Sequence, residues 1–244
     1  YTLDIRVLTL LFNKRKGLQR FRLYTALTRE YEKNVFSISS DPWNEPISYW
    51  KEKFIHLYQN ENYSLALSIS ERIIEIEKMS PEGWGMRGIS LINLRRTHEA
   101  GFCFSHKFVH AAETPLMLWI KGEYAEENGN LQEAQQKYLE VPLIHPTQPA
   151  PQISLARLYY KQRKFWESVE VCNRVLERYD ANTLALYYKG ESLLATGQMK
   201  EALACYEQIC STSPDESKGC LKAAQCYIKL GDFQNADRIA SSVL

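Results

Sequence analysis

Long hydrophobic runs are missing from this sequence of 244 residues. The longest early run, VLTLLF at residues 7–12, is far shorter than the roughly 20 apolar residues that a membrane-spanning helix needs. An initiator methionine is missing too, since the chain begins at Tyr1, and no polar closing helix follows its last repeat, which stops at Leu244. We therefore expect a fragment of a longer protein.

An excess of charge of either sign is also absent. The chain has 30 lysines and arginines and 29 aspartates and glutamates, so its formal net charge is +1. This balance gives no electrostatic reason to expect a nucleic-acid partner. The local basic cluster KRKGLQRFR at residues 14–22 is typical of a solvated surface.

Cysteines are few and have no regular spacing. The six cysteines argue against a disulfide framework and favour free thiols in a reducing compartment, so we expect a cytoplasmic location. Cys205 and Cys210 lie five residues apart in GQMKEALACYEQICSTSP, residues 197–214, which reads as one helix. That spacing turns the two thiols away from each other. We expect both cysteines to be small apolar residues of the helix rather than a redox or metal motif.

Motifs of known catalytic chemistry are lacking. The sequence contains no G-x-S-x-G, no P-loop and no dinucleotide-binding glycine pattern. The neighbouring carboxylates Glu126 and Glu127, like Glu75 and Glu77, lie in helical context, where solvated charge is the ordinary interpretation. We therefore expect no enzyme activity, no cofactor and no small-molecule substrate.

One group of residues is a weak candidate for a metal site. Cys103, His106 and His110 have the spacing i, i+3, i+7, which places three possible ligands on one side of a predicted helix. A structural zinc site needs four ligands, and the H-E-x-x-H pattern is absent. The three residues also fall outside the apolar stripe of that helix. We interpret them as exposed helix residues rather than metal ligands.

What the sequence does contain is a repeat of thirty-four residues. The chain can be divided at residues 47, 81, 115, 149, 183 and 217 without an insertion or deletion. The eighth position then holds Phe54, Gly88, Gly122, Ala156, Gly190 and Ala224. The eleventh holds Leu57, Leu91, Ala125, Tyr159, Leu193 and Tyr227. The fourth position is less regular, with Trp50, Trp84, Leu118, Gln152, Leu186 and Cys220. Small and apolar residues four and three apart predict one face of a helix.

The second half of each unit repeats in the same register. Position twenty holds Ala66, Ala100, Ala134, Ser168, Ala202 and Ala236. Position twenty-four holds Ser70, Phe104, Tyr138, Cys172, Tyr206 and Ala240. Gly129, Gly197 and Gly231 fall at position fifteen, between the two predicted helices, where a tight turn favours glycine. Each unit is thus predicted to be a helix-turn-helix.

This pattern resembles the tetratricopeptide repeat, in which a bulky residue, Leu-Gly and Tyr are followed by Ala, an aromatic residue and Pro over thirty-four residues. The resemblance implies an all-α fold, a right-handed solenoid of helix pairs, over residues 47–244. It also implies a non-catalytic scaffold that binds a peptide or a partner subunit, within a larger complex.

Residues 1–46 do not match the repeat. LDIRVLTLLF and RFRLYTALTREYEKNV read as two helices, and SISSDPWNEP at residues 37–46 reads as a turn that leads into the first unit. We expect a capping hairpin over the first repeat, because terminal units need a special partner. The alternative is an amphipathic anchor in residues 1–16, which would make the protein a membrane-associated assembly or secretion factor. An enzyme whose catalytic domain lies outside this chain is a third possibility.

By the resemblance, the first helix of each unit lines a concave groove through its positions two, five, nine and twelve. The groove residues that we single out are Lys51, Tyr58, Trp119, Glu123, Arg157, Tyr160, Tyr187 and Glu191. Two of these assignments stay open, because a small rotation of the helix would exchange Trp119 with Leu118, or Tyr187 with Tyr188. Aromatic and arginine side chains are the usual anchors of protein interfaces.

A subgroup of the family clamps a C-terminal carboxylate with lysine at position five and asparagine at position nine. Here Lys51 is followed by Ile55, and only Lys218 and Lys222 of the last unit fit the rest of that pattern. We therefore expect the ligand to be an extended or helical protein segment with apolar anchors rather than an acidic tail.

Overall fold

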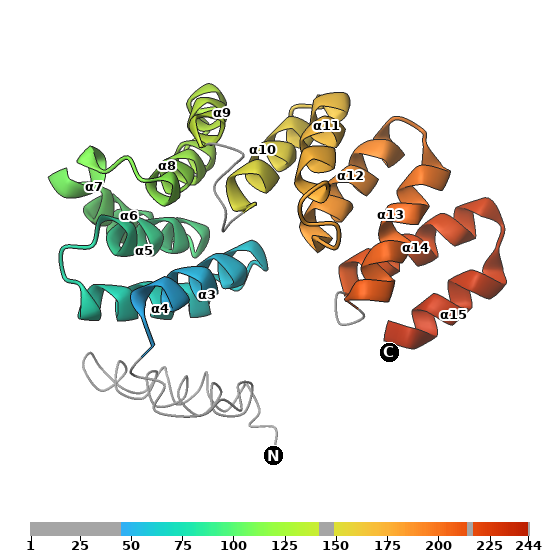
Figure 1. Cartoon of the computed structure of the whole chain (residues 1–244), viewed down its shortest axis with the longest axis horizontal. Helices are drawn as coiled ribbons and strands as arrows, with labels where there is room; N and C mark the ends of the chain where they lie inside the picture. The colour runs from blue at the N-terminus through green and yellow to red at the C-terminus, as the bar shows by residue number, and fades with distance from the viewer. Residues whose placement is uncertain (1–44, 142–148, 214–216, 244) are drawn as a thin grey trace, which may run out of the picture. The chain divides into compact units, whose positions relative to one another are not determined.

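The computed structural model describes residues 45–141, 149–213 and 217–243, and every regular element in these ranges is an α-helix (Figure 1). The helices are α3 (Ile47–Gln59), α4 (Tyr63–Ile76), α5 (Pro81–Asn93), α6 (Thr97–Phe104), α7 (Lys107–Ala111), α8 (Pro115–Glu127), α9 (Leu131–Glu140), α10 (Ala150–Lys161), α11 (Phe165–Leu176), α12 (Thr183–Ala195), α13 (Met199–Thr212), α14 (Ser217–Leu230) and α15 (Phe233–Val243). The expected all-α fold of helix pairs is confirmed. The expected N-terminal hairpin and the anchor in residues 1–16 lie outside the described residues.

Residues 53–244 form one compact unit, in which successive helices pack on one another from α4 to α6 and from α8 to α15, while α5 packs on α8 (Figure 1). The second helices, α4, α6, α9, α11, α13 and α15, begin at residues 63, 97, 131, 165, 199 and 233. These starts are thirty-four residues apart, so the geometric repeat has the same length as the sequence repeat.

Side-chain caps set the start of three of the first helices. Ser80 Oγ accepts a hydrogen bond from Gly83 N at 3.3 Å, and Thr114 Oγ1 accepts one from Met117 N at 3.2 Å. Each cap is followed by a proline at the first helical position, where the missing N–H costs nothing. Asn182 caps α12 in the same way, through Ala185 N at 2.9 Å.

The turn between the two helices of a unit has a left-handed residue. Gly129, Gly197 and Gly231 have φ values of 80°, 82° and 81° at this position. In the other three units Glu61, Arg95 and Arg163 adopt φ of 60°, 62° and 60°. A non-glycine residue is strained in this region, so the turn geometry is imposed by the helix pair rather than by glycine alone.

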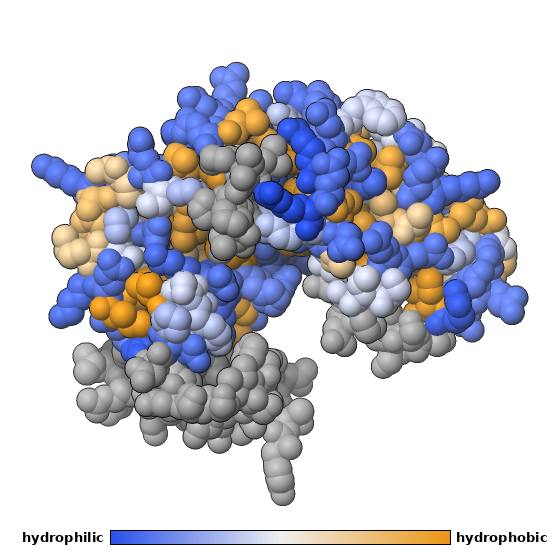
Figure 2. Space-filling view, viewed as in Figure 1, coloured by the Kyte–Doolittle hydropathy of each residue, from blue (hydrophilic) through white to orange (hydrophobic). Residues whose placement is uncertain are grey.

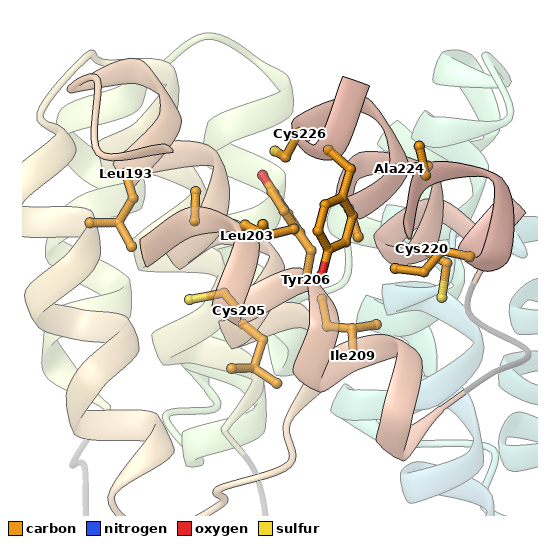
Figure 3. Close-up of a cluster of buried hydrophobic side chains, with 14 residues drawn as sticks. Leu193, Leu203, Cys205, Tyr206, Ile209, Cys220, Ala224 and Cys226 are labelled. Atoms are coloured by element: carbon orange, nitrogen blue, oxygen red, sulfur yellow. The ribbon is translucent and has the colours of Figure 1, made fainter. Parts of the chain in front are cut away.

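Rings of the second helices pack into the glycines of the first helices. A Cβ atom added at Gly190 would lie 2.7 Å from the ring of Tyr206, and the rings of Phe104 and Tyr138 stand in the same way against Gly88 and Gly122. Figure 3 shows Tyr206 within an apolar cluster of α12 to α15, beside Leu203, Cys205 and Ile209 of its own helix. The two helices can thus approach closely, because a large ring on one helix fills the space that a glycine leaves on the other.

The second unit departs from the pattern. Its outer helix α6 ends at Phe104, and the short helix α7 follows after Ser105 and His106. As a result α5 packs directly on α8, while α6 makes no extensive contact with α8 among the described helices. The prediction of one continuous helix through residues 98–110 is wrong.

The cysteines are not all free thiols, as the sequence suggested. Cys210 at the end of α13 and Cys220 on α14 form a disulfide, with Cα atoms 5.2 Å apart. Cys205 is a buried free thiol, as are Cys103, Cys172 and Cys226. The prediction is therefore wrong for the Cys210–Cys220 pair, which the packing of α14 on α13 brings together.

The surface carries no membrane-spanning element within the ranges that the structure describes, since none of the helices there is both long and apolar enough to cross a bilayer. On the face shown in Figure 2, apolar residues are scattered among hydrophilic ones. Several large apolar side chains are nonetheless exposed, among them Phe102, Trp166, Leu221 and Ile228.

Candidate functional site

Glu123 on α8 lies at the centre of a buried polar network. Its carboxylate accepts hydrogen bonds from the hydroxyls of Tyr58 (3.2 Å), Tyr138 (3.0 Å) and Ser154. Arg157 Nη2 lies 2.9 Å from both of its oxygens. Only 2% of the Glu123 side chain is exposed, so the partners of this predicted groove residue all lie within the protein.

Trp119 is also an interior residue. It is 1% exposed, donates a hydrogen bond from Nε1 to Ser154 Oγ at 3.0 Å, and meets the ring of Tyr58 edge-on with centroids 5.5 Å apart. Leu118 is the more exposed of the two neighbours. The ambiguity left open by the sequence is thus settled, and Trp119 and Tyr58 are packing residues rather than accessible groove residues in this structure.

Glu126 joins the same network one helical turn after Glu123. Lys161 Nζ lies 2.6 Å from one of its oxygens and Arg157 Nη2 lies 2.9 Å from the other. Burial alone would raise the pKa of Glu126, but the two cations hold this pKa below its usual value. The interpretation of Glu126 as solvated charge is therefore wrong, whereas Glu127, Glu75 and Glu77 are exposed.

The tyrosines of this network are neutral hydrogen-bond donors. Burial and the nearby carboxylate of Glu123 raise the pKa of Tyr58 and of Tyr138 well above the usual value. For Arg157, burial acts against the charged form, but Glu123 and Glu126 raise its pKa further. The network is thus a fixed arrangement of two carboxylates, a guanidinium and hydroxyls, and the cost of burying its charges is met by pairing them.

A second polar cluster surrounds Glu191 on α12. Tyr206 donates to its Oε1 at 2.7 Å, Lys222 Nζ lies 2.7 Å from the same oxygen, and the hydroxyl of Tyr160 donates to Oε2 at 3.3 Å. Burial would lower the pKa of Lys222, yet the hydrogen bond to Glu191 raises it. Glu191 on α12 therefore binds side chains of α10, α13 and α14.

Three half-buried tyrosines lie beside this second cluster. Tyr187 packs edge-on against Tyr206, with ring centroids 6.2 Å apart, and Lys222 Nζ lies 6.0 Å from the centroid of the Tyr187 ring. Tyr188 contacts both Tyr187 and Tyr160 through ring edges. Burial raises the pKa of Tyr188 to about 12. Of the predicted groove residues, Tyr160, Tyr187 and Glu191 thus come together, and Lys51 is half-buried on α3.

The weak metal candidate does not assemble. Cys103 is buried and its sulfur lies 3.1 Å from Arg87 Nη1. His106 precedes α7 and its ring lies between Trp84 and Phe108, at centroid distances of 4.6 and 5.1 Å. Because the helix breaks between them, the i, i+3, i+7 geometry is lost, and within the described ranges no three acidic, cysteine or histidine side chains are placed to hold a metal ion. The expectation that Cys103 is exposed is wrong.

Sequence reasoning missed Tyr138, Ser154, Lys161 and Lys222 as members of the two clusters. The repeat could have revealed two of them. Ser154 follows Glu123 by 31 residues and Lys161 follows Glu126 by 35, so each lies on the next first helix. Adjacent first helices therefore place polar residues of neighbouring units within hydrogen-bonding distance.

Part of the sequence matches a known family, and the fold resembles that of solved structures. Residues 153–217 match the family model described as the tetratricopeptide repeat. The structure resembles PilW, described as a widely conserved type IV pilus biogenesis factor, with a TM-score of 0.60 at 14% identity over 82% of this chain and 93% of that chain. It also resembles the thermophilic TPR protein TTC0263 of Thermus thermophilus, with a TM-score of 0.58 at 15% identity over 75% of this chain and all 100% of the other.

A third similar structure is the human IFIT1 dimer with PPP-AAAA, with a TM-score of 0.57 at 15% identity. The likeness covers 82% of this chain and 50% of IFIT1. At such identities the shared property is the fold, an array of helix pairs. Residues 153–217 thus match the tetratricopeptide repeat in sequence, and the described helix pairs share the fold of TTC0263.

Proposed function

We propose that this chain is a non-catalytic interaction module that holds a helical or extended segment of a partner protein against α10, α12 and α14. The observation that carries the proposal is the group of half-buried tyrosines, Tyr160, Tyr187 and Tyr188, whose rings are held by contacts with one another and with the Glu191 cluster. Fixed aromatic side chains offer large contact areas at little cost in conformational entropy.

The two polar clusters divide the predicted groove residues by role. Glu123 accepts hydrogen bonds from Tyr58 and Arg157, and Trp119 donates one to Ser154 of the same network. In this proposal these residues give the array its rigidity. Tyr160, Tyr187 and Glu191 keep partly exposed surface and serve as the contact set. We also propose that residues 47–244 act as six units that start at 47, 81, 115, 149, 183 and 217, with residues 1–46 as their cap.

An assembly factor with a membrane anchor in residues 1–16 is the second candidate. The likeness to PilW, a pilus biogenesis factor, favours an assembly role of some kind. Flotation of the full chain with liposomes, compared with a chain that lacks residues 1–16, tests the anchor. Flotation lost on deletion supports it, whereas equal recovery of both chains in the unbound fraction removes it.

Partners other than proteins are not part of the proposal. IFIT1, a structure with the same fold, is a dimer with PPP-AAAA, but the net charge of +1 gives this chain no comparable attraction for a polyanion. Cytoplasmic residence, expected from six free thiols, is kept as a proposal only. The Cys210–Cys220 disulfide weighs against it, because disulfides persist in oxidising compartments. Thiol labelling in intact cells decides: six reactive cysteines after denaturation support the cytoplasm, and four exclude it.

The groove assignment is tested by photo-crosslinking and affinity capture. The double variant Tyr160→Ala, Tyr187→Ala is compared with the parent chain and with a Trp166→Ala control, which alters an exposed ring on the outer helix α11. Loss of the partner in the double variant alone, with crosslinks that map to α10, α12 or α14, supports the proposal. Equal capture by all three chains places the contact surface elsewhere.

A further inference from the structure

Helix α14 carries two exposed apolar side chains on one stripe. Leu221 is 51% exposed and Ile228 is 53% exposed. The two residues are seven positions apart, which is two helical turns, so they lie on the same side of the helix about 10 Å from each other. Gln225, also exposed, lies between them on the same side. Solvation of such a stripe is unfavourable, and its geometry fits a second helix.

At the same two register positions, the residues of α8 are buried and those of α12 are half-buried. Leu221 and Ile228 occupy positions five and twelve of their unit, as Trp119 and Glu126 do in α8, and as Ile153 does at position five of α10. Those three residues are buried, at 1%, 7% and 3% exposure. In the middle of the array a neighbouring first helix packs alongside, as α12 packs on α10. Among the described first helices, only α14 has exposed residues at both of these positions, and no described helix covers them.

The charged side chains that α14 itself carries are all positive. α14, residues 217–230, contains three lysines and no aspartate or glutamate. Lys218 is 65% exposed, and its only ion pair in the described residues is with Glu61, itself 64% exposed, at 3.0 Å. Such an exposed pair contributes little and can be exchanged for another carboxylate. Lys222 remains bound to Glu191, and Lys229 is exposed at the far end of the stripe.

We propose that this face of α14 binds an amphipathic helix of a partner protein whose apolar stripe is flanked by acidic residues. The partner helix lies along α14, with apolar side chains over Leu221 and Ile228. Its carboxylates face Lys218 and Lys229. The inference rests on the proposed function, since α14 is one wall of the same groove, and it adds the chemical class of the partner.

The probe for the test is a designed, fluorescein-labelled peptide of about 15 residues, the length at which isolated helices become appreciable. It carries leucines at helical spacing and glutamates at the flanking positions, and a matched peptide has lysines in place of the glutamates. Fluorescence anisotropy with the full chain is expected to show binding of the acidic peptide only. This binding should weaken with added salt, because charge attraction between exposed groups is screened.

Two variants of the chain separate the two contributions. Leu221→Ala with Ile228→Ala is expected to weaken binding by at least about tenfold, because burial of two such side chains exceeds one decade in affinity. Lys218→Gln with Lys229→Gln is expected to weaken binding less and to flatten its salt dependence. Phe102→Ala, at an exposed ring of α6, serves as the control and should bind like the parent chain. Circular dichroism checks that all chains are equally helical.

Three results overturn the inference: no binding of the acidic peptide, equal binding of the basic peptide, or binding that is unchanged in the Leu221→Ala, Ile228→Ala variant. A dimer of the parent chain in sedimentation that dissociates in this variant would assign the stripe to a second copy instead. If the natural partner is still lost from the Tyr160→Ala, Tyr187→Ala variant while the peptide fails to bind, the proposed function stands and only this inference falls.

Discussion

Arg157 Nη2 lies 2.9 Å from both carboxylate oxygens of Glu123, although 34 residues separate the two in sequence. The contact joins α10 to α8 at a junction where the packing of α10 on α9 is less extensive than that of α12 on α11. Hydrogen bonds and ion pairs thus link the two units where the packing of α10 on α9 is less extensive. The predicted groove residue Arg157 is consequently a structural residue, and its substitution is not a clean test of binding.

We predict that Arg157→Ala destabilises the chain by about 3–5 kcal/mol, because it leaves the buried carboxylate of Glu123 without a counter-ion. Urea unfolding followed by circular dichroism measures this loss. The matched control is Arg96→Ala, which removes a surface pair with Glu99 whose side chains are 47% and 45% exposed, and it should cost about 0–1 kcal/mol. Equal losses in the two variants would contradict a structural role for the network.

The stability of this junction should also depend on pH through Glu126. Burial acts to raise the pKa of Glu126, but Arg157 and Lys161 keep it below its usual value of 4.5. A carboxyl whose pKa is lower in the folded state contributes stability above its unfolded pKa and loses that contribution as pH falls through the folded value. The free energy of unfolding should therefore fall as the pH drops below about 4.5.

The comparison with Glu126→Gln isolates this contribution. The variant should be less stable than the parent chain at pH 7, and the gap should narrow as the pH falls below about 4.5, where the parent carboxyl takes up its proton. Glu140→Gln, which removes a carboxylate paired with Lys137 at the surface, is the control and should show a small difference throughout. If the difference in the free energy of unfolding between Glu126→Gln and the parent chain stayed constant with pH, ionisation of Glu126 would not cause the pH dependence.

The helix pairs could be predicted from sequence because local signals and the repeat agree. Thr114 followed by Pro115 indicates the start of a helix, and Gly129 indicates a turn. Each signal recurs thirty-four residues away, so errors at one unit are corrected by the others. The charge pair Glu123 and Arg157 was also readable, because both occupy position nine of successive units and carry opposite signs.

What the sequence analysis did not reveal depends on tertiary contacts between different helices. The break after Phe104 occurs in one unit only, where α5 packs directly on α8. The pairing of Cys210 with Cys220 depends on the packing of α14 on α13, and their spacing fits no framework. The burial of Glu126 could not be seen from its own helix, because Lys161 lies on α10.

Gly190 is predicted to be required for the approach of α12 to α13. An added Cβ atom would lie 2.7 Å from the ring of Tyr206, which is fully buried and donates a hydrogen bond to Glu191. We expect Gly190→Ala to lower the free energy of unfolding by about 1–3 kcal/mol, as overpacking does in a filled core. Thermal or urea unfolding provides the measurement.

The matched control for Gly190 is Gly101, in the middle of α6. A Cβ atom there would meet nothing within 4 Å, and the residue is exposed. Gly101→Ala should therefore stabilise the chain by about 0.4–1 kcal/mol, because alanine loses less conformational entropy than glycine on folding. If both substitutions shifted stability in the same direction, packing of Tyr206 on Gly190 would not be the cause.

The disulfide between Cys210 and Cys220 closes a short loop, since the two residues are 10 positions apart. Constraint of a loop of this length in the unfolded chain contributes about 2–3 kcal/mol to stability. Reduction of the parent chain should lower the free energy of unfolding by that amount, whereas Cys210→Ser should be equally stable with and without reductant. Cys205→Ser, at a buried free thiol of the same helix, should keep its response to reductant. A parent chain whose stability is unaffected by reductant, or in which six thiols react after denaturation without reduction, would show that the bond is not formed.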